Sequence, residues 1–322
     1  MGDKRRERGI LWSVYRDDEF KEQAREGDER PDFVLRRNGG VNSFGVEVTE
    51  LYQSESLARI GRIPTYGRDL LAGGRHIHKA DLRELKVVTA EHRDNLGNRK
   101  GMVDVFFVPK LDPLEYGRRL AERIDDKAQK ASGYDRTLSH INLVIHDMTG
   151  TFRGWGRGDA AAAVVTSLCY DTIARSPFRE IVVITTAEEN AWVLVPMKQH
   201  LLLSHAYAFD AVYSPLVDSE RTEAEWTDAF AQFMCERGFR VYRHVGASEE
   251  AAIGYGNASL GIPLGEDLAI YDHADEPLPV GSVAVVCGQT TSPELHAAFS
   301  TFLAENVFVS GFIQNAVATP PS

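Results

Sequence analysis

Two β-type runs separated by a turn signal constrain the fold of this chain more than any other feature. The runs extend from Pro31 to Leu35 and from Phe44 to Leu51, and both are rich in aromatic and β-branched residues. Between them stands Asn38-Gly39-Gly40, which is typical of a tight hairpin turn. In the second run apolar residues alternate with Gly, Glu and Thr, which indicates a strand with one face toward a core. We therefore predict two paired antiparallel strands.

The elements around this hairpin predict an α/β fold. A polar segment from Asp17 to Glu26 indicates a short helix. After the hairpin we expect a buried strand at Val103 to Pro109, a helix at Pro113 to Ala131 and a strand at His140 to His146. Because the last strand follows a crossover helix, it can lie parallel to an earlier strand. The expected order is helix, three strands, helix, strand, in a mixed β-sheet flanked by helices.

Two regions depart from this simple alternation. Residues 52–101 are basic and rich in Gly, with one expected helix around Lys79 to His92, and we interpret them as an insertion. The expected later elements are a helix (159–174), two strands that extend the sheet (180–186, 191–197), a helix (222–237), two strands (239–244, 282–287) and a closing helix (293–315). Single cores rarely exceed about 250–300 residues. We therefore predict a domain at 1–200 and an acidic α+β extension at 201–322.

Charge is distributed unevenly along the chain. Residues 1–150 carry 27 Lys and Arg against 26 Asp and Glu, whereas residues 151–322 carry 9 against 21. Only the first part has enough cations to contact phosphates. We expect any nucleic-acid contact there, and a protein partner or homo-oligomer contact in the acidic half.

The cysteines and the hydropathy pattern bear on the compartment. Cys169, Cys235 and Cys287 form no CxxC pair, so we expect neither a disulfide framework nor a thiolate metal site. The basic start of the sequence is followed by Arg16, Asp17 and Asp18 rather than by a long apolar run, which argues against a signal peptide. We therefore expect a cytoplasmic protein without a membrane contact.

Two carboxylates of the hairpin are the strongest candidates for chemistry. Asp32 stands at the start of the first strand and Glu47 lies in the facing strand, so the two can lie close together. Hard oxygen ligands suit Mg²⁺ or Mn²⁺, and the carbonyl of Val48 is available as a third ligand. The pattern predicts a divalent-metal site.

This arrangement resembles the PD-(D/E)xK nuclease superfamily, also called the restriction-endonuclease-like fold. The resemblance rests on Pro31-Asp32, on Glu47-Val48-Thr49 and on the order of elements over roughly residues 15–150. It implies that Asp32 and Glu47 hold Mg²⁺. It also implies that an acidic residue of the preceding helix, Glu19 or Glu22, could be a further metal ligand.

The chain departs from the family where lysine is expected, because Thr49 stands there. In the family this lysine orients the attacking water and stabilises developing charge. Some members carry the cation on the helix after the third strand, and here Lys127 or Lys130 could supply it. Thr49 positioning the water is the other alternative.

A basic stretch after the hairpin could grip a nucleic-acid backbone. Its candidate contacts are Arg59, Arg62, Arg68, Arg75 and Lys79. Gly154-Trp155-Gly156-Arg157-Gly158 lacks the Lys-Ser/Thr of a phosphate-binding loop. The sequence thus predicts a metal-dependent nuclease that hydrolyses phosphodiester bonds, with DNA as the expected substrate. The alternative is an inactive member of the same fold that binds nucleic acid or protein.

Overall fold

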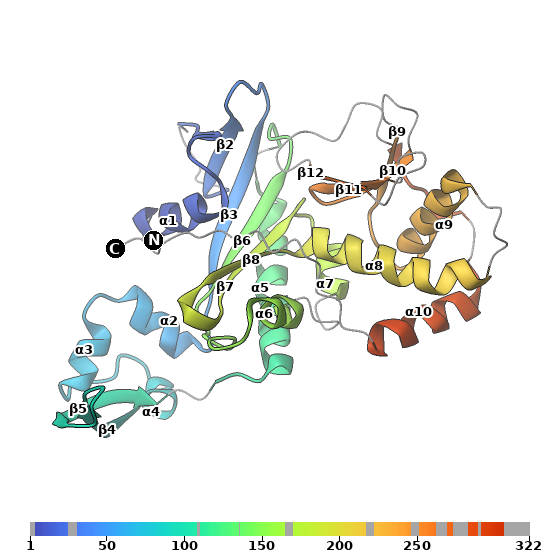
Figure 1. Ribbon diagram of the computed structural model, residues 1–322. Helices are drawn as coiled ribbons and strands as arrows, with labels where there is room; N and C mark the ends of the chain where they lie inside the picture. Colours follow the sequence, from blue (N-terminus) through green and yellow to red (C-terminus); the bar gives the residue numbers. More distant parts are fainter. Residues whose placement is uncertain are drawn as a thin grey trace.

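A computed structural model describes the chain at residues 4–24, 31–107, 110–134, 136–164, 170–216, 222–245, 251–261, 269–272, 283–288 and 291–305. It is an α/β structure whose main layer is a mixed six-stranded sheet flanked by helices (Figure 1). The predicted fold class is confirmed at this level.

The main sheet has the strand order β1-β2-β3-β6-β7-β8. Its strands are β1 (Phe20–Glu22), β2 (Phe33–Arg37), β3 (Ser43–Leu51), β6 (Ile141–Asp147), β7 (Ile181–Thr186) and β8 (Trp192–Pro196). The first three strands are antiparallel neighbours, β3, β6 and β7 run parallel, and β8 is antiparallel to β7. The predicted hairpin is confirmed as β2 and β3, and the predicted later strands of the sheet are β7 and β8.

The first two elements of the chain differ from the prediction. The first helix, α1, is Lys4–Val14, and the expected helix at 17–26 is instead a turn followed by β1; residues 25 and 26 lie outside the described part. Phe20 occupies the core, and Lys21 and Glu22 face solvent, because β1 is a short edge strand that pairs with β2 over three residues. The three strands of the predicted order are therefore β1, β2 and β3. β1 takes the place that we expected for the strand at 103–109.

Helices of two sets cover the opposite faces of the main sheet. Ile10 and Leu11 of α1 pack on Val46 and Val144. On the other face, α5 (Pro113–Ala131) packs Leu120 and Ile124 on Leu143 and Ile145. Val144 and its two neighbours in β6 thus serve different cores, since successive side chains of a strand alternate between faces.

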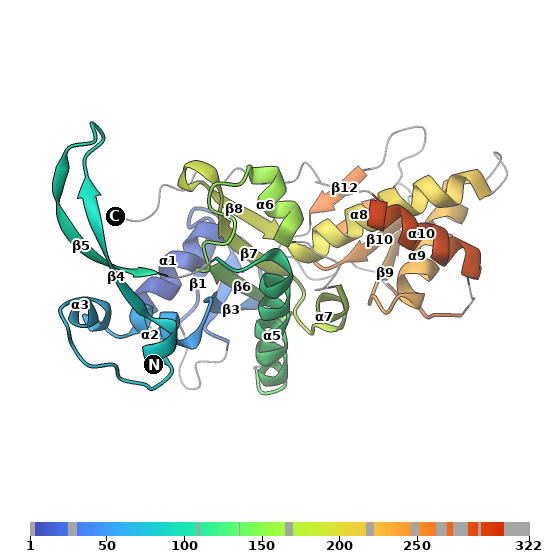
Figure 2. The same ribbon diagram turned by 90° about the horizontal axis from the view of Figure 1, so that it is seen from below.

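The insertion after β3 folds differently from the expectation. It contains the short helices α2 (Glu55–Arg62), α3 (Tyr66–Leu71) and α4 (Asp81–Glu84), then β4 (Lys86–Arg93) and β5 (Arg99–Phe107). The expected helix at 79–92 is wrong beyond the single turn of α4. The strand expected at 103–109 exists as part of β5, with residues 108 and 109 outside the described part. It pairs only with β4, in a two-stranded ribbon that projects from the main sheet (Figure 2), and its valines are partly exposed.

The predicted helix at 159–174 corresponds to α6 (Arg157–Val164) and α7 (Tyr170–Arg175), with 165–169 outside the described residues. The sequence analysis did not predict α8 (Met197–Tyr213), a buried helix. This helix runs through residue 200, where we expected the first domain to end. It packs on the main sheet and on the second sheet described next.

The C-terminal region is α+β, as predicted. Its five-stranded sheet has the order β12-β11-β10-β9-β13. The strands are β9 (Tyr242–Val245), β10 (Ala251–Tyr255), β11 (Ala258–Gly261), β12 (Ala269–Asp272) and β13 (Val283–Ala284), and the helices are α9 (Glu223–Glu236) and α10 (Pro293–Glu305). Residues 306–315 of the predicted closing helix lie outside the described part.

Cys235 and Cys287 form a disulfide, which contradicts the expectation of unpaired cysteines. The two residues are 52 positions apart, so no local motif announces the bond. Disulfides persist in oxidising compartments, and the bond gives no support to the expected reducing cytosol. Within the described segments, no helix has the length and apolar character needed to cross a membrane.

Candidate functional site

Asp32 lies immediately before β2 and is held by two donors. The backbone N–H of Val48 donates to its Oδ2 at 3.0 Å, and the Lys4 ammonium donates to its Oδ1 at 3.0 Å. The pairing of β2 with β3 ends at Phe33 and Val46. Residues 47–51 of β3 therefore extend past β2, and Asp32 turns back onto this extension. The hairpin register places the Asp32 carboxylate at Val48, the residue after Glu47 in β3.

Glu47 lies on the α5 face of β3, because it alternates with the inward-facing Val46 and Val48. Its Oε1 accepts a hydrogen bond from Lys127 of α5 at 2.5 Å. The side chains of Glu47 and Lys127 are only 9% and 16% exposed. Water therefore screens this ion pair much less than a surface pair.

Helix α1 adds two residues that the sequence reading missed. The Lys4 ammonium lies 3.0 Å from Asp32 Oδ1 and 3.3 Å from Glu7 Oε2. Burial raises the pKa of Glu7, the charge of Asp32 raises it further, and Lys4 and Lys127 act in the opposite sense. Burial alone would lower the pKa of Lys4, but its bonds to Asp32 and Glu7 outweigh that effect and raise it.

Together these side chains form what we call the carboxylate–lysine cluster, which consists of Lys4, Glu7, Asp32, Glu47 and Lys127. The helices that supply it cover opposite faces of the sheet, yet Glu7 of α1 interacts electrostatically with Lys127 of α5. They meet beside residues 47–51 of β3, which extend past β2 and pair with β6 alone. The only local signals for the α1 residues are the spacing of Lys4 and Glu7 and the apolar Ile10 and Leu11 on a helical stripe.

The remaining residues of the ExT segment are buried. Thr49 is 8% exposed and Val48 is 3% exposed, so Thr49 does not occupy the solvent-facing position that an alternating strand suggested. β3 is covered on both faces at this point. Glu50 next to Thr49 is held by Arg6 at 2.6 Å and by the Tyr52 hydroxyl at 2.9 Å. Burial and the bond to Glu50 raise the pKa of Tyr52 to about 12.

Three candidates lie apart from the cluster. Glu19 is in the turn before β1, 3.4 Å from Arg16, and Glu22 is bound by Arg8 at 2.8 Å. Neither is on the helix that precedes β1, which corrects the expected position of the extra acidic residue. Lys130 is on α5, but its side chain is 58% exposed and its ammonium lies 3.9 Å from Asp126. Of the two lysines considered, the structure brings Lys127 to Glu47.

The basic residues of the insertion have mixed surroundings. Arg59 pairs with Asp81, which is fully buried. Burial acts to raise the pKa of Asp81, but the bonds from Arg59, Ser56 and Tyr66 hold it well below its usual range. Arg59 is thus committed to a structural ion pair. The other four candidates are exposed: Arg62, Arg68, Arg75 and Lys79. The Arg62 guanidinium lies over the Tyr52 ring.

The cluster has an oxygen-rich ligand set, with lysines already in place. The Lys4 ammonium bridges Asp32 and Glu7, and the Lys127 ammonium binds Glu47. In the part of the chain that the structure describes, no three His, Cys, Asp or Glu side chains are arranged to hold a metal ion. A metal would therefore have to take the place of the Lys4 ammonium between the two carboxylates.

Comparisons with known proteins give no further guide. No protein-family model, curated protein or solved structure matches this chain.

Proposed function

We propose that this protein is a metal-dependent nuclease that hydrolyses phosphodiester bonds, with DNA as the expected substrate. The observation that carries the proposal is that two carboxylate–ammonium groups, Lys4 shared by Asp32 and Glu7 and Lys127 bound to Glu47, flank the part of β3 that extends past β2. Carboxylates gathered around a cation, with a further ammonium at hand, are what phosphoryl transfer requires.

The order of elements supports the resemblance to PD-(D/E)xK nucleases. The chain runs α1, β1, β2, β3, α5, β6, which is the helix, three strands, helix, strand order of that family once the insertion at 52–107 is set aside. Asp32 immediately precedes β2 and Glu47 lies in β3, which is close to the family pattern. Lys127 would take the role of the lysine that Thr49 replaces.

The donor chemistry fits a hard divalent cation. The Lys4 ammonium lies between Asp32 and Glu7, which shows that these two carboxylates can share one positive charge. Mg²⁺ or Mn²⁺ held there by Asp32, Glu47 and Glu7 would polarise a phosphate oxygen and lower the pKa of a bound water. The Val48 N–H fixes the Asp32 carboxylate. Lys127 would place its charge where negative charge develops on the phosphate.

The test compares the parent protein with Asp32→Asn and Glu47→Gln in Mg²⁺, in Mn²⁺ and in EDTA. We expect the parent to cleave DNA only with metal and each variant to lose at least about 100-fold in rate. Glu122→Gln is the matched control, because it removes one carboxylate from the exposed surface of α5.

Metal binding gives a second readout that needs no substrate. A cation at about 100 times its Kd should raise the parent's free energy of unfolding by about 2.7 kcal/mol, and it should raise that of Glu122→Gln equally. Asp32→Asn should gain much less. Cleavage that survives in both site variants, or equal metal stabilisation of all three proteins, would refute the proposed site.

A non-catalytic member of the same fold is the second candidate function. It is favoured by the ion pairs that already satisfy Asp32 and Glu47 and by the absence of a preformed metal-ligand group among the described residues. In that case the parent would bind nucleic acid in a salt-dependent manner, and neither Mg²⁺ nor Mn²⁺ would produce cleavage.

A further inference from the structure

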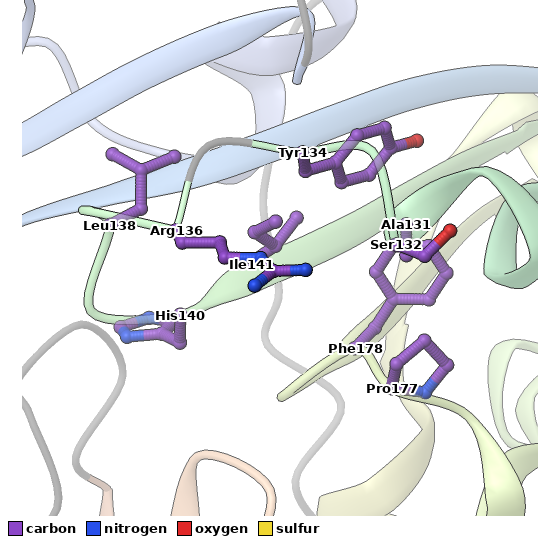
Figure 3. Close-up of a pocket in the computed structure, with 9 residues that line it drawn as sticks. All are labelled: Ala131, Ser132, Tyr134, Arg136, Leu138, His140, Ile141, Pro177 and Phe178. Atoms are coloured by element: carbon purple, nitrogen blue, oxygen red, sulfur yellow. The ribbon is translucent and has the colours of Figure 1, made fainter.

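A pocket of about 330 Å³ opens near the N-terminal end of β6 (Figure 3). It lies between the C-terminal end of α5, the loop that leads into β6, and the segment before β7. Its walls include Tyr134, Leu138, Ile141 and Phe178. The volume is at the lower end of the range for small-molecule sites, so one flat ring system is the expected size of occupant.

The pocket and the cluster share the α5 side of the sheet. Lys127 lies one helical turn before Ala131, which lines the pocket, so both are on one stripe of α5. Gly45 is two residues before Glu47 and therefore on the same face of β3. A Cβ on Gly45 would lie 3.1 Å from Leu138 and from Ile141, and 2.5 Å from Pro31. Gly45 thus lies next to two residues of the pocket wall and to Pro31, the residue before Asp32.

Arg136 supplies a positive charge to the pocket. Its guanidinium extends into the pocket near Ile141 and toward Phe178 (Figure 3). Arg136 is exposed, and in the described part of the chain no carboxylate forms an ion pair with it. An arginine of this kind can bind a phosphate with two parallel hydrogen bonds.

His140 is a neutral, largely buried residue of the same wall. Its ring stacks on Phe44 at 5.1 Å, and its Nδ1 lies 3.2 Å from Arg179 Nη1 and accepts from it. Burial and the charge of Arg179 lower the pKa of His140 to about 3. The proton of the neutral ring therefore belongs on Nε2, which is buried and has no hydrogen-bond partner among the described residues.

We propose that this pocket binds an unpaired nucleobase of the substrate strand, with the adjoining phosphate on Arg136. Aromatic and aliphatic walls match the faces of a base, Arg136 can bind the adjoining phosphate, and the neighbouring cluster would act on the same strand. The proposal rests on the proposed nuclease function. It specifies the substrate as nucleic acid with an unpaired base, such as a single-stranded end, a flap or an extruded nucleotide.

The test measures binding in EDTA, so it does not depend on cleavage. Fluorescence of 2-aminopurine is followed in a single-stranded DNA and in the matching duplex, and a single strand with an abasic site in place of 2-aminopurine is measured as a competitor. We expect the parent to change the fluorescence of the single strand and to bind the abasic strand about 5- to 150-fold more weakly.

Two variants probe the pocket without altering its core. Arg136→Ala should weaken binding about tenfold or more, because a charge-assisted contact to phosphate is lost. Ser132→Glu should weaken binding because it places a carboxylate beside the pocket and Arg136. Arg153→Ala is the matched control, since it removes an equal charge from an exposed turn elsewhere, and it should bind as the parent does.

The outcomes separate the pocket from the nuclease function. Base-dependent binding that is lost in Arg136→Ala and Ser132→Glu supports the pocket even when Mg²⁺ and Mn²⁺ produce no cleavage. Equal affinity for the abasic strand, no fluorescence change with the parent, or parent-like binding by both pocket variants would overturn it, even in a protein that cleaves DNA with metal.

Discussion

The ion pair between Glu47 and Lys127 is the contact on which the site depends most, and its strength can be measured. The perturbation is a double-mutant cycle with Glu47→Gln, Lys127→Met and the double variant. The two charges are 2.5 Å apart and 9% and 16% exposed. At an effective dielectric constant near 20 the attraction is about 5 kcal/mol or more, and the cost of removing both groups from water offsets a large part of it.

We expect each single variant to lose about 3 kcal/mol in the free energy of unfolding, because the remaining partner is left buried and unpaired. The double variant should lose clearly less than the sum, which gives a coupling energy of about 2 kcal/mol. Urea denaturation in EDTA at pH 7 measures all four proteins. Moderate salt should change the coupling little, since water and ions reach the pair poorly.

The matched control is the ion pair between Arg118 and Glu122 on the exposed side of α5. A cycle at this pair should give a coupling below about 0.5 kcal/mol that added salt removes. If the Glu47–Lys127 coupling were equally small and equally sensitive to salt, Lys127 would be an ordinary solvated lysine. The reasoning that assigns it a place in the site would then be wrong.

Three further predictions concern the fold that supports the site. Gly45→Ala should lower the free energy of unfolding by about 1–3 kcal/mol, because the new Cβ would lie 2.5 Å from Pro31. In Gly9→Ala of α1 the new Cβ meets nothing within 4 Å, so this change should raise the free energy of unfolding by up to about 1 kcal/mol. Equal effects of the two changes in thermal denaturation would contradict this reasoning. His205 is fully buried, and burial lowers its pKa to about 3; the unfolded chain therefore binds the extra proton below pH 6.5. The parent should lose about 1.4 kcal/mol per pH unit relative to His205→Leu between pH 6.5 and about 4, and parallel pH profiles of the two proteins would show that His205 does not titrate in this way. Reducing the disulfide, or replacing Cys235 by Ser, should cost about 4 kcal/mol because the bond closes a loop of 52 residues; a melting temperature that reductant leaves unchanged would mean that the bond does not form.

Local sequence signals determined the hairpin and the elements that follow it in the sheet. The Asn-Gly-Gly turn and the alternation in β3 are properties of neighbouring residues, so they can be read without knowing the partners. The capped start of α5, with Asp112 accepting from the Glu115 N–H and Pro113 at the first turn, is of the same kind. The first helix was misplaced because the charged residues at 17–26 have helical spacing, although Phe20 belongs to a strand and packs against Tyr15 and Phe44.

The local sequence pattern could not predict which strands pair with one another. The apolar run at 103–107 has the composition of a buried strand, but it pairs with β4 in a projecting ribbon and both of its valines remain partly exposed. The residues at 86–92 have helical spacing and form β4 instead, because strand pairing with β5 overrides local propensity. The strands β10, β11 and β12 are short, and each is stabilised by its neighbours in the second sheet rather than by its own sequence.

For the site, the sequence by itself determined the register of β2 and β3, which places Asp32 beside the strand that carries Glu47, because a hairpin register is set by its turn. It also predicted that one of two lysines of α5, Lys127 or Lys130, would approach that strand. Only the tertiary structure chose Lys127, since residues three apart on a helix share a face and their rotation toward β3 depends on how the whole helix packs. The contribution of Lys4 and Glu7 was likewise decided in three dimensions. These residues lie 25 or more positions before Asp32, and only the packing of α1 across the sheet brings their charges to the carboxylates of the hairpin.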